Sequence, residues 1–270
     1  MLIDIHAYVG HWPFRQLRGS TCASLLERMD SRGVTHSCVS NINGIFYKNT
    51  QSANEELHDE INSSSAFLDK MIPFAAINPS YNGWQHDLEV CHESMGMKGM
   101  KLYPRYHEYG ITDPRCIEAV KMARDRKMPV AFSLRMIDLR QRSWMDAGTD
   151  MVLNDIADIV REVPDAAYMV LDTRIPEGTA ATTAENTRIL KNANLVFDSV
   201  RASGVPVIGY NGAGIQDLID TFGKDKLAFG SETPFVDYVT PFLRLEVYPG
   251  DEATKELIWH GNARRILGMT

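Results

Sequence analysis

The chain lacks the features that would place it in a membrane, in an oxidising compartment or on nucleic acid. It has no apolar run of about 18–20 residues, so the sequence predicts no membrane span. Its four cysteines form no CxxC pair, which fits reduced, buried thiols rather than disulfides. Lys and Arg number 28 against 35 Asp and Glu, a formal net charge of −7 at pH 7. Because phosphate binding needs clustered cations, we expect no nucleic-acid partner.

Two further absences concern domain organisation and targeting. The sequence has no Pro/Ser linker, charge block or low-complexity tract, so we expect one domain over residues 1–270. Residues 2–6 begin like a buried strand, without the basic and apolar regions of a secretion signal, which predicts a cytoplasmic protein. With 44% hydrophobic and 23% charged residues, a chain of this length can bury a sizeable core.

Short apolar runs alternate along the chain with longer amphipathic stretches. The runs predict strands over residues 3–9, 35–41, 72–77, 99–103, 130–135, 168–173, 195–199 and 227–230. The stretches between and after them predict helices over residues 22–31, 52–68, 84–94, 115–126, 153–162, 185–193, 215–222 and 255–267.

This alternation predicts an α/β fold, a (β/α)8 TIM barrel. Dividing the chain by eight gives about 34 residues per unit, close to a typical βα repeat. A doubly wound open sheet is the alternative. That fold usually carries a glycine-rich phosphate turn after its first strand, and residues 6–11 contain no GxGxxG motif. Since barrel enzymes build their sites at the carboxyl ends of the strands, we expect the site there.

Polar and ionisable side chains recur at these strand ends. Alternation along the first strand predicts that Asp4, His6 and Tyr8 share one face, with His11 and Trp12 just beyond. Later strand ends carry Lys101, Arg105, Ser133, Arg135, Asp172, Arg174, Asp198 and Glu232. Ionisable groups are costly to bury unless they are paired or used. The ionisable side chains at the strand ends therefore either form internal salt bridges that stabilise a barrel or belong to an active site.

Ordered motifs along nearly the whole chain resemble the amidohydrolase-type metal-dependent hydrolases. The resemblance is to the branch that includes aminocarboxymuconate-semialdehyde decarboxylase and 2-pyrone-4,6-dicarboxylate lactonase. The motifs are IDIH at 3–6, GV at 33–34, NP at 78–79, KGMKLYP at 98–104, PV at 129–130, PD at 164–165, FGS at 229–231 and NARRILG at 262–268. The resemblance implies a barrel enzyme whose chemistry sits at the strand ends.

The resemblance also implies a metal site, from which this chain departs. The family pattern has His-x-His on strand one, and here His6 is followed by Tyr8. Ser133 and Asp172 stand where the family has histidines, and Glu232 stands where it has an aspartate. His6, Asp172 and Glu232 could still bind one divalent metal, Zn, Mn or Fe. The lost imidazoles argue instead that no metal cofactor is bound.

A cationic rim is the second departure. Alternation predicts that Arg105, Arg135 and Arg174 face inward, together with Lys101. They are either counter-charges for Asp172 and Glu232 or a clamp for a carboxylate or phosphate of a substrate. The lactonase relatives are described as acting on a dicarboxylate without a metal, which implies a small anionic substrate as the partner.

The expected function is hydrolysis of a lactone or similar carbonyl compound in a small organic acid. Asp172 or Glu232 would be the general base, His6 an acid, and Lys101 or Arg174 would polarise the carbonyl. The predicted substrate-binding residues are Arg105, Arg135, Arg174, Tyr8, Ser133, His11 and Trp12. Two alternatives stay open: an inactive barrel that binds small molecules or serves as a structural protein, and a metal-dependent decarboxylase or hydrolase using His6, Asp172 and Glu232. Aromatic residues after position 234 lie either in a loop wall or in a homo-oligomer contact.

Overall fold

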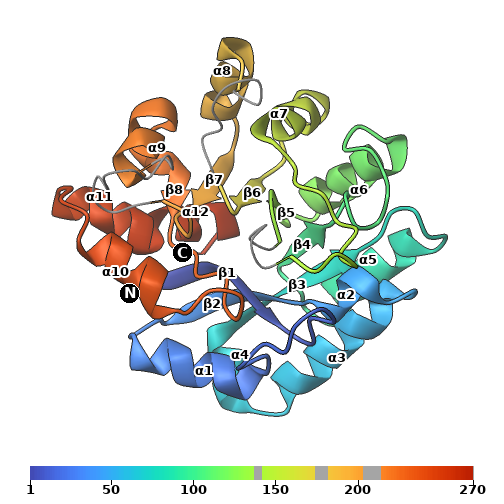
Figure 1. The fold of residues 1–270 in the computed structure, drawn as a ribbon. Coiled ribbons are helices and arrows are strands. Elements are labelled where there is room, and N and C mark those ends of the chain that lie inside the picture. Colours follow the sequence, from blue (N-terminus) through green and yellow to red (C-terminus); the bar gives the residue numbers. More distant parts are fainter. Residues whose placement is uncertain (137–141, 174–181, 203–213, 270) are drawn as a thin grey trace.

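Eight parallel strands surround one axis in the computed structural model, which describes residues 1–136, 142–173, 182–202 and 214–269. The strands pair in chain order and helices cover the outside, as Figure 1 shows along the barrel axis. The predicted (β/α)8 barrel is confirmed. The strands are β1 (Ile3–Val9), β2 (His36–Asn41), β3 (Met71–Ile77), β4 (Gly99–Leu102), β5 (Val130–Ser133), β6 (Tyr168–Leu171), β7 (Leu195–Asp198) and β8 (Leu227–Ala228).

The segment that follows β8 closes the barrel against β1. Ile5 N donates to Phe229 O at 2.9 Å, and Glu232 N donates to His6 O at 2.7 Å. Tyr8 N donates to Thr233 O at 2.8 Å. Because these bonds run alongside β1, they hold the backbone of Glu232 beside that of His6.

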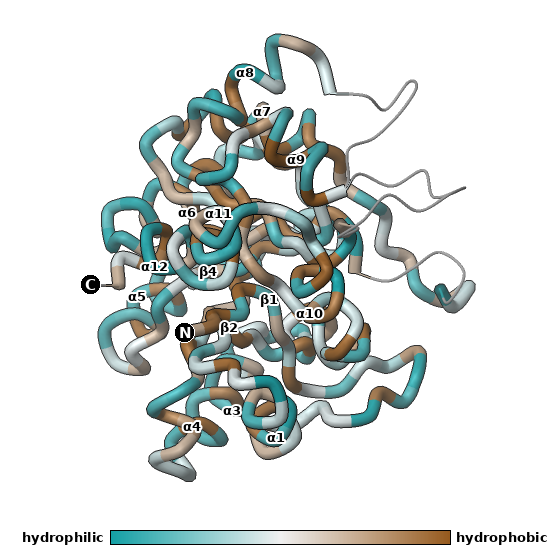
Figure 2. The backbone as a smooth tube through the Cα atoms, turned by 90° about the vertical axis from the view of Figure 1, so that its left-hand side faces the viewer, coloured by the Kyte–Doolittle hydropathy of each residue, from teal (hydrophilic) through white to brown (hydrophobic). Residues whose placement is uncertain are grey.

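Several helices begin at a residue whose side chain caps the first turn. Thr21 accepts from Ser24 N at the start of α1, and Asp113 accepts from Arg115 N at the start of α6. The helices are α1 (Cys22–Ser31), α2 (Asn43–Phe46), α3 (Thr50–Asn62), α4 (Ser65–Lys70), α5 (Trp84–Glu93), α6 (Pro114–Asp125), α7 (Leu153–Glu162), α8 (Ala184–Asn192), α9 (Ile215–Phe222), α10 (Val239–Glu246), α11 (Glu252–Glu256) and α12 (Asn262–Leu267). In Figure 2 the N-terminus and the end of α12 lie on the same side of the molecule.

Some predicted boundaries differ from those of the structure. The helix expected over 52–68 is two helices, because Ser64 adopts extended backbone between α3 and α4. The helix expected over 255–267 consists of α11, a π-helical turn at Leu257–Gly261, and α12. Strand β6 ends at Leu171 rather than at 173 because Asp172 takes a positive φ of 59°. Helices α2 and α10 were not expected.

A β-bulge in β1 overturns the prediction that Asp4, His6 and Tyr8 share one face. Asp4 pairs with Ser37 and Ala7 with Val39, so β1 holds one residue more than β2 over this stretch. The extra residue reverses the alternation. His6 and Tyr8 consequently face the mouth of the barrel. Asp4 lies apart from them, where it accepts from Ser231, Tyr238 and backbone amides.

Two layers of apolar side chains stabilise the barrel, one inside the ring of strands and one between the strands and the helices. Its interior is filled by buried side chains from seven strands, namely Ile3, Ile5, Cys38, Phe74, Ala131, Met169, Leu171, Val196 and Ala228. A larger cluster, which includes Leu25, Leu57, Val120 and Ile156, packs the helices onto the outside of the strands. All four cysteines are buried and free, as expected from their spacing.

Candidate active site

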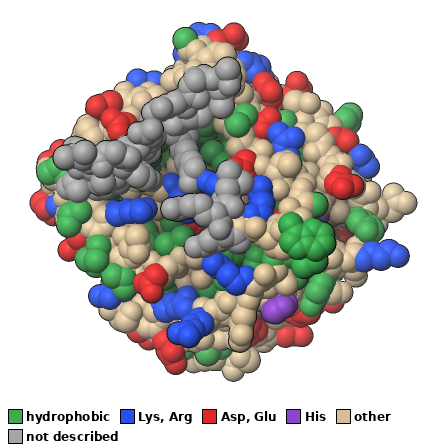
Figure 3. All heavy atoms as spheres, in the orientation of Figure 1, with side chains coloured by type: hydrophobic (Ala, Val, Ile, Leu, Met, Phe, Trp, Pro, Cys, Tyr) green, Lys and Arg blue, Asp and Glu red, His purple; other side chains and the backbone are tan. Residues whose placement is uncertain are grey.

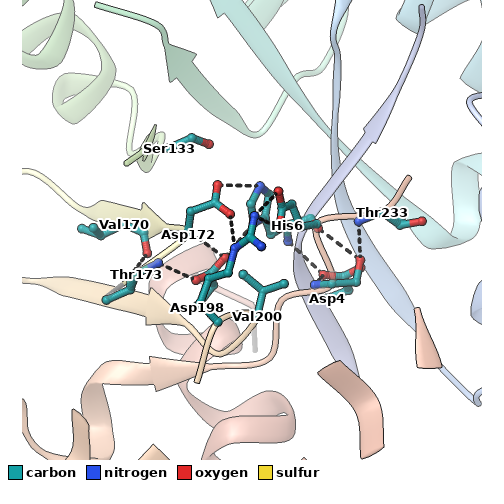
Figure 4. Close-up of polar contacts among 12 residues, drawn as sticks. Asp4, His6, Ser133, Val170, Asp172, Thr173, Asp198, Val200 and Thr233 are labelled. Atoms are coloured by element: carbon teal, nitrogen blue, oxygen red, sulfur yellow. Dashed lines mark hydrogen bonds and ion pairs between the residues drawn. The ribbon is translucent and has the colours of Figure 1, made fainter. Parts of the chain in front are cut away.

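A buried histidine–aspartate pair joins β1 to β7 at the mouth of the barrel. His6 Nδ1 lies 2.6 Å from Asp198 Oδ2, and both side chains are fully buried. Burial lowers the pKa of His6 to about 3 and raises the pKa of Asp198 to about 6. At neutral pH a neutral imidazole therefore donates from Nδ1 to an ionised Asp198, which leaves Nε2 as an acceptor facing the mouth. Figure 4 shows this pair beside Asp172.

Two buried carboxyl groups, Asp172 and Glu232, face each other beside His6. Asp172 Oδ2 lies 3.9 Å from His6 Nε2. Asp172 and Glu232 both contact Arg201, and each shifts the pKa of the other. Burial raises the pKa of both, and the charge of Asp172 raises the pKa of Glu232 further. We therefore place the shared proton on Glu232 and the negative charge on Asp172.

Arg201, which follows β7, is the counter-charge of this carboxyl pair. Its Nη2 lies 2.7 Å from Glu232 Oε1, and its Nε lies 3.4 Å from Asp172 Oδ1. The side chain of Arg201 is 15% exposed, whereas both carboxyl groups are 1% exposed. Glu232 and Asp172 raise the pKa of Arg201 against the effect of burial. The guanidinium therefore stays charged and connects the pair to the mouth.

The backbone holds both carboxyl groups in an unusual conformation. Asp172 has φ 59° and Glu232 has φ 55°, in the left-handed region that is uncommon for residues other than glycine. Asp198 supports the turn at Asp172 by accepting from Asp172 N at 3.0 Å and from Thr173 N at 3.2 Å. Strain of this kind persists only where the surroundings fix it, and it clusters at functional sites.

A second polar chain meets His6 at Nε2, the same nitrogen that Asp172 approaches. The Tyr8 hydroxyl lies 3.1 Å from His6 Nε2 and 2.9 Å from Ser133 Oγ, and it accepts from Lys101 Nζ. Lys101 also lies over the Tyr8 ring, 3.8 Å from its centroid. Burial lowers the pKa of Lys101 to about 7, although Asp172 opposes that shift. The structure thus brings together His6, Lys101, Asp172 and Glu232, the predicted catalytic residues.

An aromatic cluster forms the wall behind Tyr8. Trp12 is 1% exposed, and its ring stacks edge-on against Phe14, Phe46 and Phe235 with centroids 5.0 to 5.3 Å apart. Phe235 in turn contacts the Tyr8 ring at 5.6 Å. Trp12 therefore packs in the aromatic cluster beside Tyr8, and its contact with a substrate stays a prediction.

Two of the predicted binding residues, Arg105 and His11, lie exposed and bond other parts of the chain. Arg105 is exposed and bonds Asp155 at 2.9 Å, because β4 ends at Leu102 and alternation no longer applies. His11 is exposed and its backbone donates to Asn43. Buried Arg135 lies 3.6 Å from Asp150, and Arg174 lies outside the described residues. Lys and Arg side chains nevertheless surround the centre of the face in Figure 3.

The donor set does not fit a divalent metal as it is arranged. Over the described ranges, no three His, Cys, Asp or Glu side chains are placed to hold a metal ion. Arg201 lies against both Asp172 and Glu232, and the Tyr8 hydroxyl lies against His6 Nε2. A guanidinium therefore stands where a cation bound by these carboxylates would stand.

Sequence reasoning missed Arg201 and gave Asp198 no role. Asp198 ends β7 and Arg201 follows it, while Asp172 and Glu232 follow the neighbouring strands β6 and β8. The position of Asp198 at a strand end was a usable signal. No sequence signal pointed to Arg201. It lies three residues past the end of β7, where the alternation of a strand no longer predicts which way a side chain points.

Comparison with known families decides the ancestry of this barrel. The model of the amidohydrolase family matches residues 69–269. The chain belongs to the amidohydrolase family. The predicted resemblance is thereby confirmed, and the strand-end cluster lies where amidohydrolase barrels, like other barrels, carry their chemistry. A search of curated proteins found no match.

Solved structures share the fold of this amidohydrolase at low identity. A dihydroxybenzoic acid decarboxylase from a Polaromonas species, with manganese and 2-nitroresorcinol bound, is 12% identical (TM-score 0.69, 99% of this chain, 97% of that one). The 5-carboxyvanillate decarboxylase of Sphingomonas paucimobilis is 13% identical (0.70, 100% and 99%). The probable 2-pyrone-4,6-dicarboxylic acid hydrolase of Acinetobacter baumannii, with citric acid bound, is 12% identical (0.66, 99% and 99%).

The length and apolarity of its helices bear on whether this amidohydrolase could cross a membrane. Within the described ranges, none is both long enough and apolar enough to cross a bilayer.

Proposed function

We propose that this amidohydrolase hydrolyses a lactone or similar carbonyl compound in a small anionic organic acid, as a single domain over residues 1–270. We propose further that Arg201 supplies the cation of its site. The observation that carries the proposal is the buried pair of Asp172 and Glu232, held on two left-handed backbone positions beside a guanidinium. Two carboxyl groups with one shared proton provide a base and an acid in the same site.

The protonation states assign the two roles. Asp172, as the ionised member, takes a proton from a water molecule whose oxygen attacks the substrate carbonyl carbon. Glu232, as the protonated member, gives its proton to the leaving oxygen when the carbon–oxygen bond breaks. The proton then returns from Asp172 to Glu232, the other member of the pair, which restores the starting state.

The other polar groups stabilise charge and bind the anion. Negative charge that develops on the carbonyl oxygen is stabilised by the Tyr8 hydroxyl and the Lys101 ammonium, which already touch each other. His6, held by Asp198, keeps the Tyr8 hydroxyl in place. Arg135 is the described guanidinium near the mouth that we assign to a substrate carboxylate. The citrate in the Acinetobacter structure is consistent with an anionic ligand in this fold.

Decarboxylation is the second candidate, because two of the three solved structures described above are decarboxylases of aromatic acids and one of these two holds manganese. It would use His6, Asp172 and Glu232 as ligands and would require Arg201 to move away from the carboxyl pair.

A ligand screen followed by two variants tests the proposal. Metal-depleted protein is screened by thermal shift against lactones, amides, and aromatic and sugar carboxylates, with and without Mn²⁺ or Zn²⁺. We expect stabilisation by an anion without metal, then turnover that falls at least about 100-fold in both Asp172→Asn and Glu232→Gln. Asp146→Asn, which removes another buried carboxylate of the mouth, is the matched control.

Three results would contradict the proposal. Unchanged turnover in Asp172→Asn and Glu232→Gln would remove the carboxyl pair from the chemistry. Stabilisation and turnover only with added metal would support the metal-dependent alternative. Binding of an anion without turnover of any compound would support a barrel that only binds.

A further inference from the structure

Two arginines near the mouth of the barrel converge on one carboxylate of the chain itself. Arg135 lies two residues past the end of β5, and Arg142 begins the next described segment. Arg135 Nε lies 3.6 Å from Asp150 Oδ2, and Arg142 Nη2 donates to Asp150 Oδ1 at 3.3 Å. Each oxygen of this carboxylate therefore has its own guanidinium, an arrangement in which proteins also bind carboxylate ligands.

The three side chains differ in their access to water. Those of Arg135 and Arg142 are 6% and 18% exposed, whereas that of Asp150 is 37% exposed. A carboxylate with more than a third of its surface in water can return to solvent at little cost, but a guanidinium withdrawn from water needs an anion beside it. Arg142 also lies 3.5 Å from the buried carboxylate of Asp146, which holds it in place. The arginines are therefore the fixed part of this contact, and the Asp150 carboxylate is the replaceable part.

Backbone contacts hold the chain at Asp150 without help from its side chain. Met151 N donates to Leu134 O at 2.7 Å, so the chain after Asp150 runs beside the end of β5. Val152 N then donates to Asp155 Oδ2 at 2.9 Å, where α7 begins. Neutralising the Asp150 side chain therefore opens its contact with the arginines and leaves the backbone in place.

We propose that Asp150 stands in for the carboxylate of the substrate: it occupies the pair of Arg135 and Arg142 in the free protein and leaves when a substrate carboxylate enters. The inference rests on the proposed function in one respect, that the substrate of this site carries a carboxylate. An internal carboxylate that occupies the pair for about nine-tenths of the time weakens the apparent affinity of an added carboxylate about 10-fold. Removing the charge of Asp150 therefore tightens the binding of a free carboxylate.

Calorimetric titration of malonate into the unchanged protein and into Asp150→Asn is the experiment. Asparagine has the shape of aspartate without its charge, so we expect Asp150→Asn to bind malonate at least about 10-fold more tightly than the unchanged protein. Adding Arg135→Met to Asp150→Asn removes one guanidinium and abolishes this gain. Malonamide, the neutral analogue of malonate, shows no gain. Folding of each variant is checked by circular dichroism and thermal unfolding.

Asp165→Asn is the matched control. Asp165 also pairs with an arginine, 3.2 Å from Arg124 Nη1. It precedes β6 and therefore lies at the end of the barrel opposite to the mouth. This variant changes the net charge by the same amount as Asp150→Asn, and we expect no gain in malonate affinity from it.

Two results would overturn the inference. One is a folded Asp150→Asn that binds malonate no more tightly than the unchanged protein. The other is a gain that Asp165→Asn shares, or that remains after Arg135→Met is added, because malonate would then bind elsewhere. Where Asp150→Asn does not fold, Asp150→Ser repeats the titration with a shorter neutral side chain. The titration needs no turnover, so failure of the proposed hydrolysis leaves it unaffected and the two failures are distinguishable.

Discussion

Replacing Lys101 with Met tests whether the ammonium beneath Tyr8 is as strongly buried as its contacts indicate. Lys101 is 2% exposed and its pKa is lowered by burial from 10.5 to about 7. Below pH 7 the folded and unfolded states both hold the proton. Between pH 7 and about 10.5 the unfolded state holds more protons than the folded one, so this group makes the free energy of unfolding rise with pH.

The size of this pH effect follows from the gap between the pKa of Lys101 in the folded state and its pKa in the unfolded state. Each pH unit within it contributes up to about 1.4 kcal/mol, and because Lys101 is half deprotonated at pH 7, the interval from pH 7 to pH 9 contributes about 2 kcal/mol. Lys101→Met removes this pH-dependent contribution. The variant also loses the hydrogen bond to Tyr8, which changes the free energy of unfolding by a constant amount over the interval. The free energy of unfolding of the unchanged protein, minus that of Lys101→Met, is expected to increase by about 2 kcal/mol over the interval.

Urea unfolding of both proteins at pH 6, 7, 8 and 9 measures this difference. Lys98→Met, at an exposed residue just before the same strand, is the control for the substitution itself. A difference between Lys101→Met and the unchanged protein that stays constant from pH 7 to pH 9 would refute the reasoning. It would show that water or counter-charges solvate the ammonium as well as bulk solvent does.

Three further variants test the parts that hold the site. Trp12→Ala empties the aromatic cluster, and urea unfolding should show a loss of about 3–5 kcal/mol; a loss below about 1 kcal/mol would mean that Trp12 is loosely packed. Asp198→Asn removes the carboxylate that accepts from His6 and from the turn at Asp172, which should cost about 1–3 kcal/mol; equal stability would contradict that network. Gly230→Ala would place its Cβ 2.8 Å from Asp198 Cβ and 3.1 Å from His6 Cβ. We therefore expect thermal unfolding to show that the free energy of unfolding falls by about 1–3 kcal/mol. Gly110→Ala, where a Cβ meets only Asp113 N at 4.0 Å, should change it little.

The fold could be predicted because its signals are local. Apolar runs, amphipathic periods and caps act over a few residues, and the bounds of α1, α7 and α9 agree with those expected from the sequence. Strand β1 was likewise placed correctly at both ends. The order of eight such units determines a barrel almost without reference to tertiary contacts.

The arrangement of the site depended on features that periodicity cannot predict. One extra residue in β1 separates Asp4 from His6, and nothing in a run of apolar residues marks where such a bulge falls. Arg201 meets Asp172 and Glu232 because of two left-handed backbone positions on other strands. The sequence located the carboxyl pair and His6 by their place at strand ends, but it did not identify Arg201 as a counter-charge of the pair.

Product analysis with metal-depleted protein tests the central claim most directly. A lactone or related compound selected by the screen is incubated with chelator-treated protein and with Glu232→Gln, while ring opening, proton release and carbon dioxide are measured. The account predicts hydrolysis by the chelator-treated protein, one proton released per ring opened to a carboxylate, no carbon dioxide, and at least about 100-fold slower turnover by the variant. Turnover that appears only when Mn²⁺ or Zn²⁺ is returned, with carbon dioxide as a product, would contradict it.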